Sequence, residues 1–264
     1  MRRGAWGVGD DNAGRYDDGD AHGSRAGDEG WNGEGGTLTW NDNLGSLMSD
    51  NKAAVIQTIR DIGIIPVVRA QSSDEAIKAI DAIRAGGISI LEITMTVPGA
   101  VAVIEEVSQR YGSEALVGAG TVLDGETARA CILAGARFVV SPSLNLETIE
   151  VCRRYGIAVM PGALTPTEVV QAWSAGADFV KVFPAGAVGG ASYIKSLKAP
   201  LPQIELVPTG GVSLKTAADF IKAGASALGV GADLVDVKAI REGQAHLITE
   251  RAREFVRIVA EART

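Results

Sequence analysis

The chain is poor in histidine and cysteine, and this shortage excludes several classes of site. It has only two histidines, His22 and His246, and neither lies among the apolar segments that predict strands. Histidine-based triads and histidine-rich metal centres are therefore not expected, and we predict no metal site. The two cysteines, Cys131 and Cys152, form no Cys-x-x-Cys motif. They indicate neither a disulfide framework nor a zinc site.

Long apolar runs and basic stripes are also missing. No run approaches the ~20 apolar residues that a membrane-spanning helix needs, and the start of the chain has no apolar signal-peptide core. No stripe of lysine and arginine interleaved with aromatic residues appears, so we predict no nucleic-acid partner and no membrane partner. These observations lead us to expect a cytoplasmic protein.

Residues 1–47 differ from the remainder because they are rich in glycine, aspartate and asparagine. The first fifty residues hold ten acidic and four basic side chains, a net of −6 out of −7 for the whole chain. Such a segment buries too little apolar surface to offset its chain entropy. We predict a disordered acidic tail over 1–47 and a folded domain over 48–264. A tryptophan-bearing docking arm stays open as an alternative to a passive extension.

From residue 48 onward, helix-like and strand-like segments alternate. The apolar spacing over 48–62 predicts one helix before the first strand. Eight strand–helix units follow, and their near-continuously apolar strands indicate a parallel sheet covered by helices. Because eight such units close a barrel, we predict an α/β fold, a (β/α)8 TIM barrel with an N-terminal helix. The predicted strands are 64–69, 88–94, 115–122, 138–141, 158–161, 179–183, 204–208 and 227–231, followed by one long helix over 241–262.

A doubly wound open sheet is the competing architecture. That fold usually shows a Gly-x-Gly-x-x-Gly turn after its first strand, and residues 69–73 read Arg-Ala-Gln-Ser-Ser. Several predicted helices instead end in Ala-Gly or Gly-Gly before the next strand, where glycine supplies a left-handed cap. This repetition favours the regular barrel.

Lys181 interrupts an apolar, β-branched run that predicts a short buried strand. Because strand side chains alternate, Phe179, Lys181 and Phe183 are expected on one face. Desolvation between aromatic neighbours disfavours the charged ammonium, which is the condition under which a lysine acts as a nucleophile. The alternative is a lysine near a strand end that reaches water or pairs with a carboxylate.

Glu92 repeats this pattern within the apolar run 90–93. Active sites of such barrels lie at the carboxyl ends of the strands, so Lys181 and Glu92 are expected at one rim as nucleophile and acid/base. A structural ion pair is the alternative. Arg69 ends the first predicted strand and suits a carboxylate or phosphate, or an ordinary ion pair at the rim.

Two glycine turns, 209–211 and 229–231, close the seventh and eighth predicted strands. Glycines let backbone N–H groups approach an anion closely, and the loops after these two strands are the usual phosphate site of the barrel. Tight turns without a ligand are the alternative. The remaining residues at predicted strand ends are Thr94, Thr121, Pro142, Pro161 and Gly162.

Eight collinear motifs, spread over about residues 53–260, resemble the KDPG/KHG aldolase family of class I aldolases. KDPG is 2-keto-3-deoxy-6-phosphogluconate, and KHG is 4-hydroxy-2-oxoglutarate. The motifs are Ile65-Pro-Val-Val-Arg69, Leu91-Glu-Ile-Thr94, Gly118-Ala-Gly-Thr121, Val140-Ser-Pro142, Met160-Pro-Gly162 with Thr165-Pro-Thr-Glu168, Val180-Lys-Val-Phe-Pro184, Val207-Pro-Thr-Gly-Gly211 and Gly229-Val-Gly231.

The resemblance implies a Schiff-base lyase that cleaves KDPG, a small keto-acid phosphate, to pyruvate and glyceraldehyde 3-phosphate. It implies a homotrimer that uses no cofactor. Lys181 would form the imine and Glu92 would shuttle the protons. Carried over in the same way, the substrate-binding residues are Arg69, Thr121, Pro142, Gly162, Phe183 and Thr209, and the phosphate-binding residues are Gly210, Gly211, Gly229 and Gly231.

The chain departs from the family pattern at two positions. Several members carry an arginine where this chain has Thr96, and others carry a serine where it has Ala232. The second change makes phosphate binding depend more on backbone donors. The phosphogalactonate epimer of KDPG and KHG therefore stay open as substrates. Outside this activity, a catalytically silent trimeric barrel used for binding or assembly and a phosphosugar isomerase or synthase stay open.

Overall fold

The computed structural model describes the backbone of residues 42–264 and the side chains from residue 52 onward, so most of the tail predicted over 1–47 lies outside the described residues. The helices are α1 (Asp42–Ile62), α2 (Ser73–Ala85), α3 (Ala100–Tyr111), α4 (Gly125–Leu133), α5 (Leu146–Arg154), α6 (Pro166–Ser174), α7 (Ala191–Lys198), α8 (Ala217–Lys222), α9 (Val237–Arg241) and α10 (His246–Arg263). The strands are β1 (Ile64–Val68), β2 (Ile90–Thr94), β3 (Leu116–Gly120), β4 (Phe138–Val140), β5 (Ala158–Met160), β6 (Gly162–Ala163), β7 (Val180–Val182), β8 (Leu206–Pro208) and β9 (Leu228–Val230).

Local sequence explains where several helices begin. In each case a polar side chain just before the first turn accepts a backbone N–H that has no partner within the helix. At α6, Thr165 and Glu168 form a reciprocal capping box, and Pro166 occupies the first helical position. The other capping residues of this kind are Ser72 at α2, Asp124 at α4, Asn145 at α5 and Asp236 at α9.

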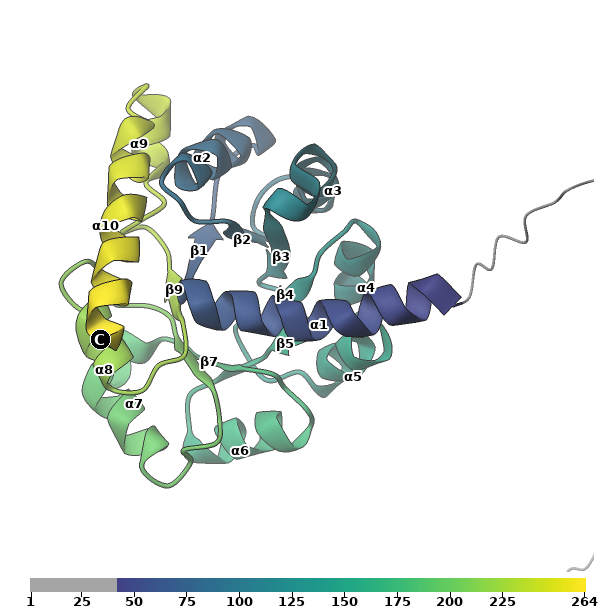
Figure 1. Cartoon of the computed structure of the whole chain (residues 1–264), viewed down its shortest axis with the longest axis vertical. Coiled ribbons are helices and arrows are strands. Elements are labelled where there is room, and N and C mark those ends of the chain that lie inside the picture. Colours follow the sequence, from purple (N-terminus) through teal and green to yellow (C-terminus); the bar gives the residue numbers. More distant parts are fainter. Residues whose placement is uncertain (1–41) are drawn as a thin grey trace, which may run out of the picture. The chain divides into compact units, whose positions relative to one another are not determined.

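The strands form a curled parallel sheet with helices on its outer side (Figure 1). Six strands pair in the order β5-β4-β3-β2-β1-β9, and three more pair in the order β6-β7-β8. The two groups approach each other at both edges. An isolated parallel bridge joins Thr209 to Gly229, and the N–H of Phe179 donates to the carbonyl of Val159 at 3.4 Å. The α/β class and the alternation of strands and helices are confirmed.

Two predicted elements differ in their bounds from the structure. The fifth predicted strand, 158–161, ends at Met160 as β5, because Pro161 has no N–H to donate to a ladder, and a short strand that was not predicted, β6, follows it. The helix predicted over 241–262 is confirmed as α10 from residue 246 onward, but its predicted start is wrong. Arg241 instead ends the separate helix α9, because the chain turns at Gly243, whose φ of +72° is left-handed. At the other end, α1 begins at Asp42, upstream of the start predicted at residue 48.

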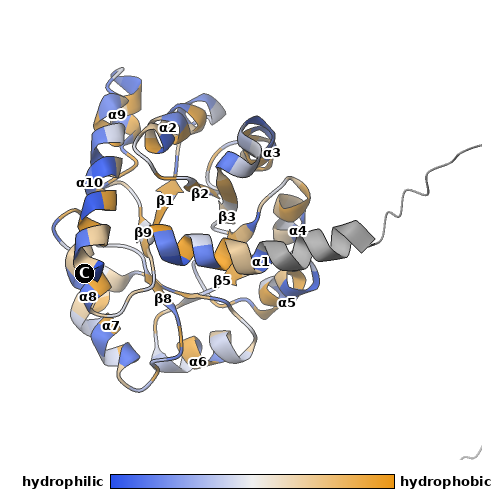
Figure 2. Ribbon diagram, in the orientation of Figure 1, coloured by the Kyte–Doolittle hydropathy of each residue, from blue (hydrophilic) through white to orange (hydrophobic). Residues whose placement is uncertain are grey.

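Two apolar layers hold these elements together. The larger lies between the strands and the surrounding helices, and the smaller fills the inside of the curled sheet. In Figure 2 the strands are orange, while much of the outer surface of α2 and α10 is blue. The inner layer is closed by Val55 and Ile59 of α1, which pack with Ile65, Ile90 and Phe138. No helix within residues 42–264 is long and apolar enough to cross a membrane.

Candidate active site

Lys181 and Glu92 meet inside the curled sheet. In β7, Val180 and Val182 pack against the helices, so alternation turns Lys181 to the inner face. Its Nζ lies 3.8 Å from Oε1 of Glu92 on β2, and the two side chains are 4% and 3% exposed. An amine and a carboxylate that are both shielded from water therefore face each other, as the alternation of their strands predicts.

The Glu92 carboxyl is electrostatically unusual. Burial raises its pKa, and the positive charges of Lys181 and Arg69 act in the opposite direction. At 3.8 Å the Lys181 contact exceeds hydrogen-bond distance, and Oε1 has no hydrogen-bond partner among the described residues. A buried acceptor without a partner is costly and is expected where a substrate group or water completes the site.

Gly120 makes room for this carboxylate. A Cβ at position 120, at the end of β3, would lie 2.1 Å from Oε1 of Glu92. Any larger side chain there would displace Glu92, so the motif glycine at the end of β3 has a packing reason within the site.

A cavity of about 220 Å³ opens at the carboxyl ends of β1, β8 and β9, and neither Lys181 nor Glu92 is among its lining residues. The Phe183 ring lies in its wall, and the ring centroid is 5.4 Å from Nζ of Lys181. Arg69 projects into the same wall from the end of β1, which places a fixed cation in the cavity. The full lining is Val67, Arg69, Phe183, Thr209, Gly210, Gly211, Val212, Gly231, Ala232 and Asp233.

The two glycine turns meet at this cavity, as their positions after β8 and β9 predict. Gly210 and Gly211 have φ values of +84° and +79°, which side-chain-bearing residues rarely adopt. Gly231 lies in the same wall. Gly229 is not in the lining, and a Cβ at this position would come within 2.1 Å of Oγ1 of Thr209. Gly229 therefore accommodates Thr209 and is not part of the cavity wall.

Three further predicted binding residues lie at strand ends but outside the cavity wall. Thr121 follows β3 with a φ of +58°, a strained value for a threonine. Pro142 follows β4 and packs on Gly162, where a Cβ would lie 2.3 Å from the Pro142 carbonyl oxygen. Strand ends position these residues correctly at the rim, while side-chain packing determines which of them reach the cavity.

Asp233 lines the cavity and is not among the site residues that the sequence predicts. A charged residue two positions after a glycine turn at a strand end is a usable signal, because such positions lie near the rim. Thr96 is also held in place there. Its hydroxyl lies 2.7 Å from that of Thr94, which donates to the Val68 carbonyl at 2.9 Å.

The sequence profile described as "KDPG and KHG aldolase" matches residues 55–251. The chain belongs to this family. A 2-dehydro-3-deoxy-6-phosphogalactonate aldolase of Escherichia coli is 36% identical over 201 residues, covering 75% of this chain and 95% of the relative. A 2-dehydro-3-deoxy-phosphogluconate aldolase of Treponema pallidum is 31% identical over 205 residues, covering 78% and 97%.

The fold of this chain is also similar to that of solved members of the family. A KDPG aldolase from Legionella pneumophila, crystallised with pyruvate captured as a covalent carbinolamine, superposes with a TM-score of 0.70. It is 29% identical and covers 75% of this chain and 96% of its own. The family resemblance and the lyase class expected from the sequence are both confirmed. The relatives differ in the substrates they are named for, so membership alone leaves the substrate of this chain open.

Proposed function

We propose that this family member is a Schiff-base aldolase in which Lys181 is the nucleophile and Glu92 the acid/base. The observation that carries the proposal is the buried Lys181–Glu92 pair at 3.8 Å, with Nζ of Lys181 5.4 Å from the ring centroid of Phe183, a residue that lines the cavity. A purely structural ion pair would not need a cavity nearby, the Arg69 cation in the wall of that cavity, or a glycine at position 120. A buried carboxyl with a raised pKa, facing an amine near a pocket, is typical of a catalytic site.

The chemistry needs one neutral amine and one nearby proton carrier. The amine of Lys181 adds to the C2 carbonyl of a 2-keto acid, and loss of water from the carbinolamine gives an iminium ion. As the C3–C4 bond breaks, its electron pair moves into the iminium, leaving an enamine and releasing the aldehyde. Protonation of the enamine at C3 and hydrolysis of the imine then give pyruvate and free Lys181.

Glu92 supplies the protons for these steps. Its raised pKa lets it hold a proton for departure of the carbinolamine hydroxyl as water. Once ionised, it can accept the proton of the C4 hydroxyl while the C3–C4 bond breaks. A positive charge still stands beside the Glu92 carboxylate at that point, because the iminium formed on Lys181 is also a cation.

KDPG is the proposed main substrate, with pyruvate and glyceraldehyde 3-phosphate as products. Arg69 would hold the keto-acid carboxylate, with Thr121, Pro142, Gly162, Phe183 and Thr209 shaping the pocket. Backbone N–H groups at the glycine turns would bind the phosphate. The phosphogalactonate epimer is the first alternative, since the Escherichia coli relative is named for it, and KHG is the second.

Three organisational features complete the proposal. The curled sheet would close as an eight-stranded (β/α)8 barrel, which the Thr209–Gly229 bridge and the Phe179–Val159 hydrogen bond support. The folded domain would begin near residue 48. The family resemblance supports a cytoplasmic homotrimer, which sedimentation of the purified chain can test.

Pyruvate release from KDPG, its phosphogalactonate epimer and KHG tests the function. Lactate dehydrogenase and NADH report the pyruvate formed from each compound under the same conditions. We expect cleavage of all three, with the highest kcat/KM for KDPG. Higher kcat/KM for one of the other two compounds would replace KDPG as main substrate, and no pyruvate from any of them would contradict the aldolase.

A further inference from the structure

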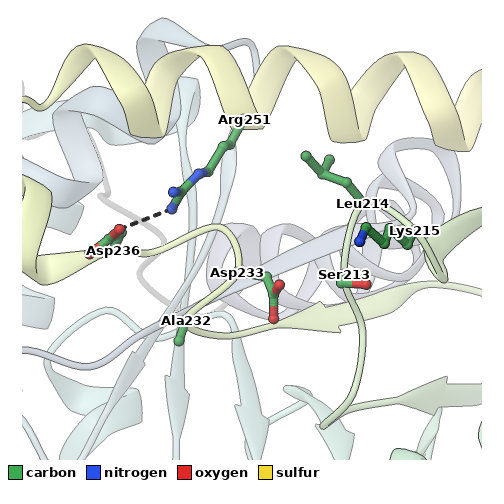
Figure 3. Close-up of a pocket in the computed structure, with 7 residues that line it drawn as sticks. All are labelled: Ser213, Leu214, Lys215, Ala232, Asp233, Asp236 and Arg251. Atoms are coloured by element: carbon green, nitrogen blue, oxygen red, sulfur yellow. Dashed lines mark hydrogen bonds and ion pairs between the residues drawn. The ribbon is translucent and has the colours of Figure 1, made fainter.

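A second, larger cavity adjoins the first at the end where the glycine turns lie. It has a volume of about 550 Å³ and shares Ala232 and Asp233 with the inner cavity. Figure 3 shows it between the loop after β8, the loop after β9 and the helix α10. Its lining residues are Ser213, Leu214, Lys215, Ala232, Asp233, Asp236 and Arg251. Asp233, an exposed residue, therefore borders both spaces.

Some charged side chains around the outer cavity have partners and others do not. Arg251 is paired with Asp236 at 3.2 Å, and the other oxygen of Asp236 accepts the N–H groups of Lys238 and Ala239 at the start of α9. Asp233 forms no ion pair and no side-chain hydrogen bond within residues 52–264, and neither does Lys215 across the outer cavity. The carboxylate of Asp233 is therefore not neutralised by a close cation from the described part of the chain.

This carboxylate lies beside the place proposed for the substrate phosphate. Gly210, Gly211 and Gly231 share the inner cavity wall with Asp233. The one cation in that wall, within the described part of the chain, is Arg69, which the proposed function assigns to the keto-acid carboxylate. A phosphate at the glycine turns would thus rely on backbone N–H groups in a wall that also contains a negative side chain.

We propose that Asp233 is a specificity-determining residue that weakens binding of a distal phosphate and so widens the substrate range towards 2-keto-3-deoxy sugar acids whose distal end is an uncharged hydroxyl. The inference rests on the proposed aldolase function and names the substrate class of the same site. The chemistry at Lys181 takes place at the keto-acid end and is the same for both kinds of substrate.

Coulomb's law sets the expected size of the effect. A phosphate monoester carries a charge of about −1.5 to −2 near neutral pH. For a separation of about 8 Å through water, repulsion between this phosphate and a carboxylate changes affinity about fivefold. Because the site is open to water, added salt screens this repulsion.

The test compares two substrates in the unaltered chain and four variants. The quantity measured is kcat/KM for KDPG divided by kcat/KM for unphosphorylated 2-keto-3-deoxygluconate. Asp233→Asn should raise this ratio about fivefold, and Asp233→Ser should raise it similarly. The matched control Asp74→Asn removes an exposed carboxylate outside both cavities and should leave the ratio unchanged. The difference between Asp233→Asn and the unaltered chain should shrink at high salt.

Lys215→Met removes a positive charge from the loop after β8, which is the opposite of removing the negative charge of Asp233. It should therefore lower the ratio. An unchanged or lower ratio in both Asp233 variants would overturn the inference, as would a shift of the same sign in Asp233→Asn and Lys215→Met. Failure of the underlying function gives a different result, since neither acid would then release pyruvate from the unaltered chain.

Discussion

The inside of the curled sheet has two halves that are equally buried and chemically opposite. Successive inward residues on one strand show the change, with Ile90 at 0% exposure and Glu92 at 2%. The same step leads from Phe179, at 0%, to Lys181, at 3%. The half at the amino ends of the strands is closed by α1 and is wholly apolar, whereas the other half carries charged side chains next to a cavity.

The difference separates the residues that stabilise the fold from those proposed to react. Apolar burial on the α1 side stabilises the domain without polar requirements. Burial of an amine and a carboxylate on the other side costs free energy that only a function or a strong mutual interaction explains. Variants in the two halves should therefore fail in different assays, those on the α1 side in unfolding experiments and those beside the cavity in rate measurements.

Lys181→Ala should have the largest effect. Removal of the amine removes the only proposed nucleophile, so pyruvate release should fall by more than about 10⁴-fold. The coupled assay measures the rate, and circular dichroism checks that the variant is folded. Lys195→Ala, which changes an exposed lysine on α7, should keep the normal rate. Turnover by Lys181→Ala close to that of Lys195→Ala would contradict the mechanism.

Glu92→Gln should have the next largest effect on catalysis. The amide keeps the size of the side chain but cannot carry the proton, so kcat should fall by about 10²–10⁴-fold. Imine formation should be partly retained, because the amine of Lys181 is still present. Single-turnover trapping separates the two steps, and the exposed Glu106→Gln is the control. A near-normal kcat would remove Glu92 from the proposed chemistry.

Phe138→Ala tests the apolar half. Its ring is fully buried and packs directly over Gly118, where a Cβ would come within 2.4 Å of the ring. The cavity left behind should lower the free energy of unfolding by about 3–5 kcal/mol, measured by urea denaturation. Leu133→Ala, at a leucine 64% exposed, should change it by less than about 0.5 kcal/mol. An equal loss in both variants would show that the inner layer does not carry the stability.

The pH dependence of stability should show the smallest effect. Burial raises the pKa of Glu92 above its ordinary value of 4.5, so the folded state binds this proton more tightly than the unfolded state. The stability contribution is complete below that ordinary value and is lost as the pH rises through the raised pKa. Relative to Glu92→Gln, the unaltered chain should therefore become less stable as the pH rises between the unfolded and folded pKa values of Glu92, by about 1.4 kcal/mol for each pH unit.

Urea denaturation of both proteins over a pH series measures this difference. A difference in unfolding free energy that stays constant, or that grows in favour of the unaltered chain as the pH rises, would contradict the assigned direction of the Glu92 pKa.

The sequence predicts those parts of the structure that follow from short periodic patterns. Strand alternation is enough to turn Lys181 and Glu92 to the same side, and a threonine followed by Pro166 and Glu168 is enough to begin α6. Short sequence patterns of this kind do not predict which side chains pack together across the sheet. The separation of Pro142 and Gly162 from the cavity wall depends on contacts between strands, as does the position of Gly229 behind Thr209.

The break between α9 and α10 shows a second limit. Apolar spacing continues past Gly243, so periodicity alone predicts one helix, while the left-handed backbone at this glycine ends α9. Asp233 shows a third limit, because its importance depends on two cavities that form only when the loops after β8 and β9 come together.

Borohydride reduction in the presence of pyruvate tests the central claim most directly. The chain is treated with pyruvate and sodium borohydride, digested, and examined by intact-mass and peptide mass spectrometry, with Lys181→Ala treated in parallel. We expect a mass gain for one reduced pyruvyl adduct, located on Lys181 and missing from the variant. A folded chain that gains no adduct, or that carries it on another lysine, would contradict the assignment of Lys181 as the Schiff-base residue.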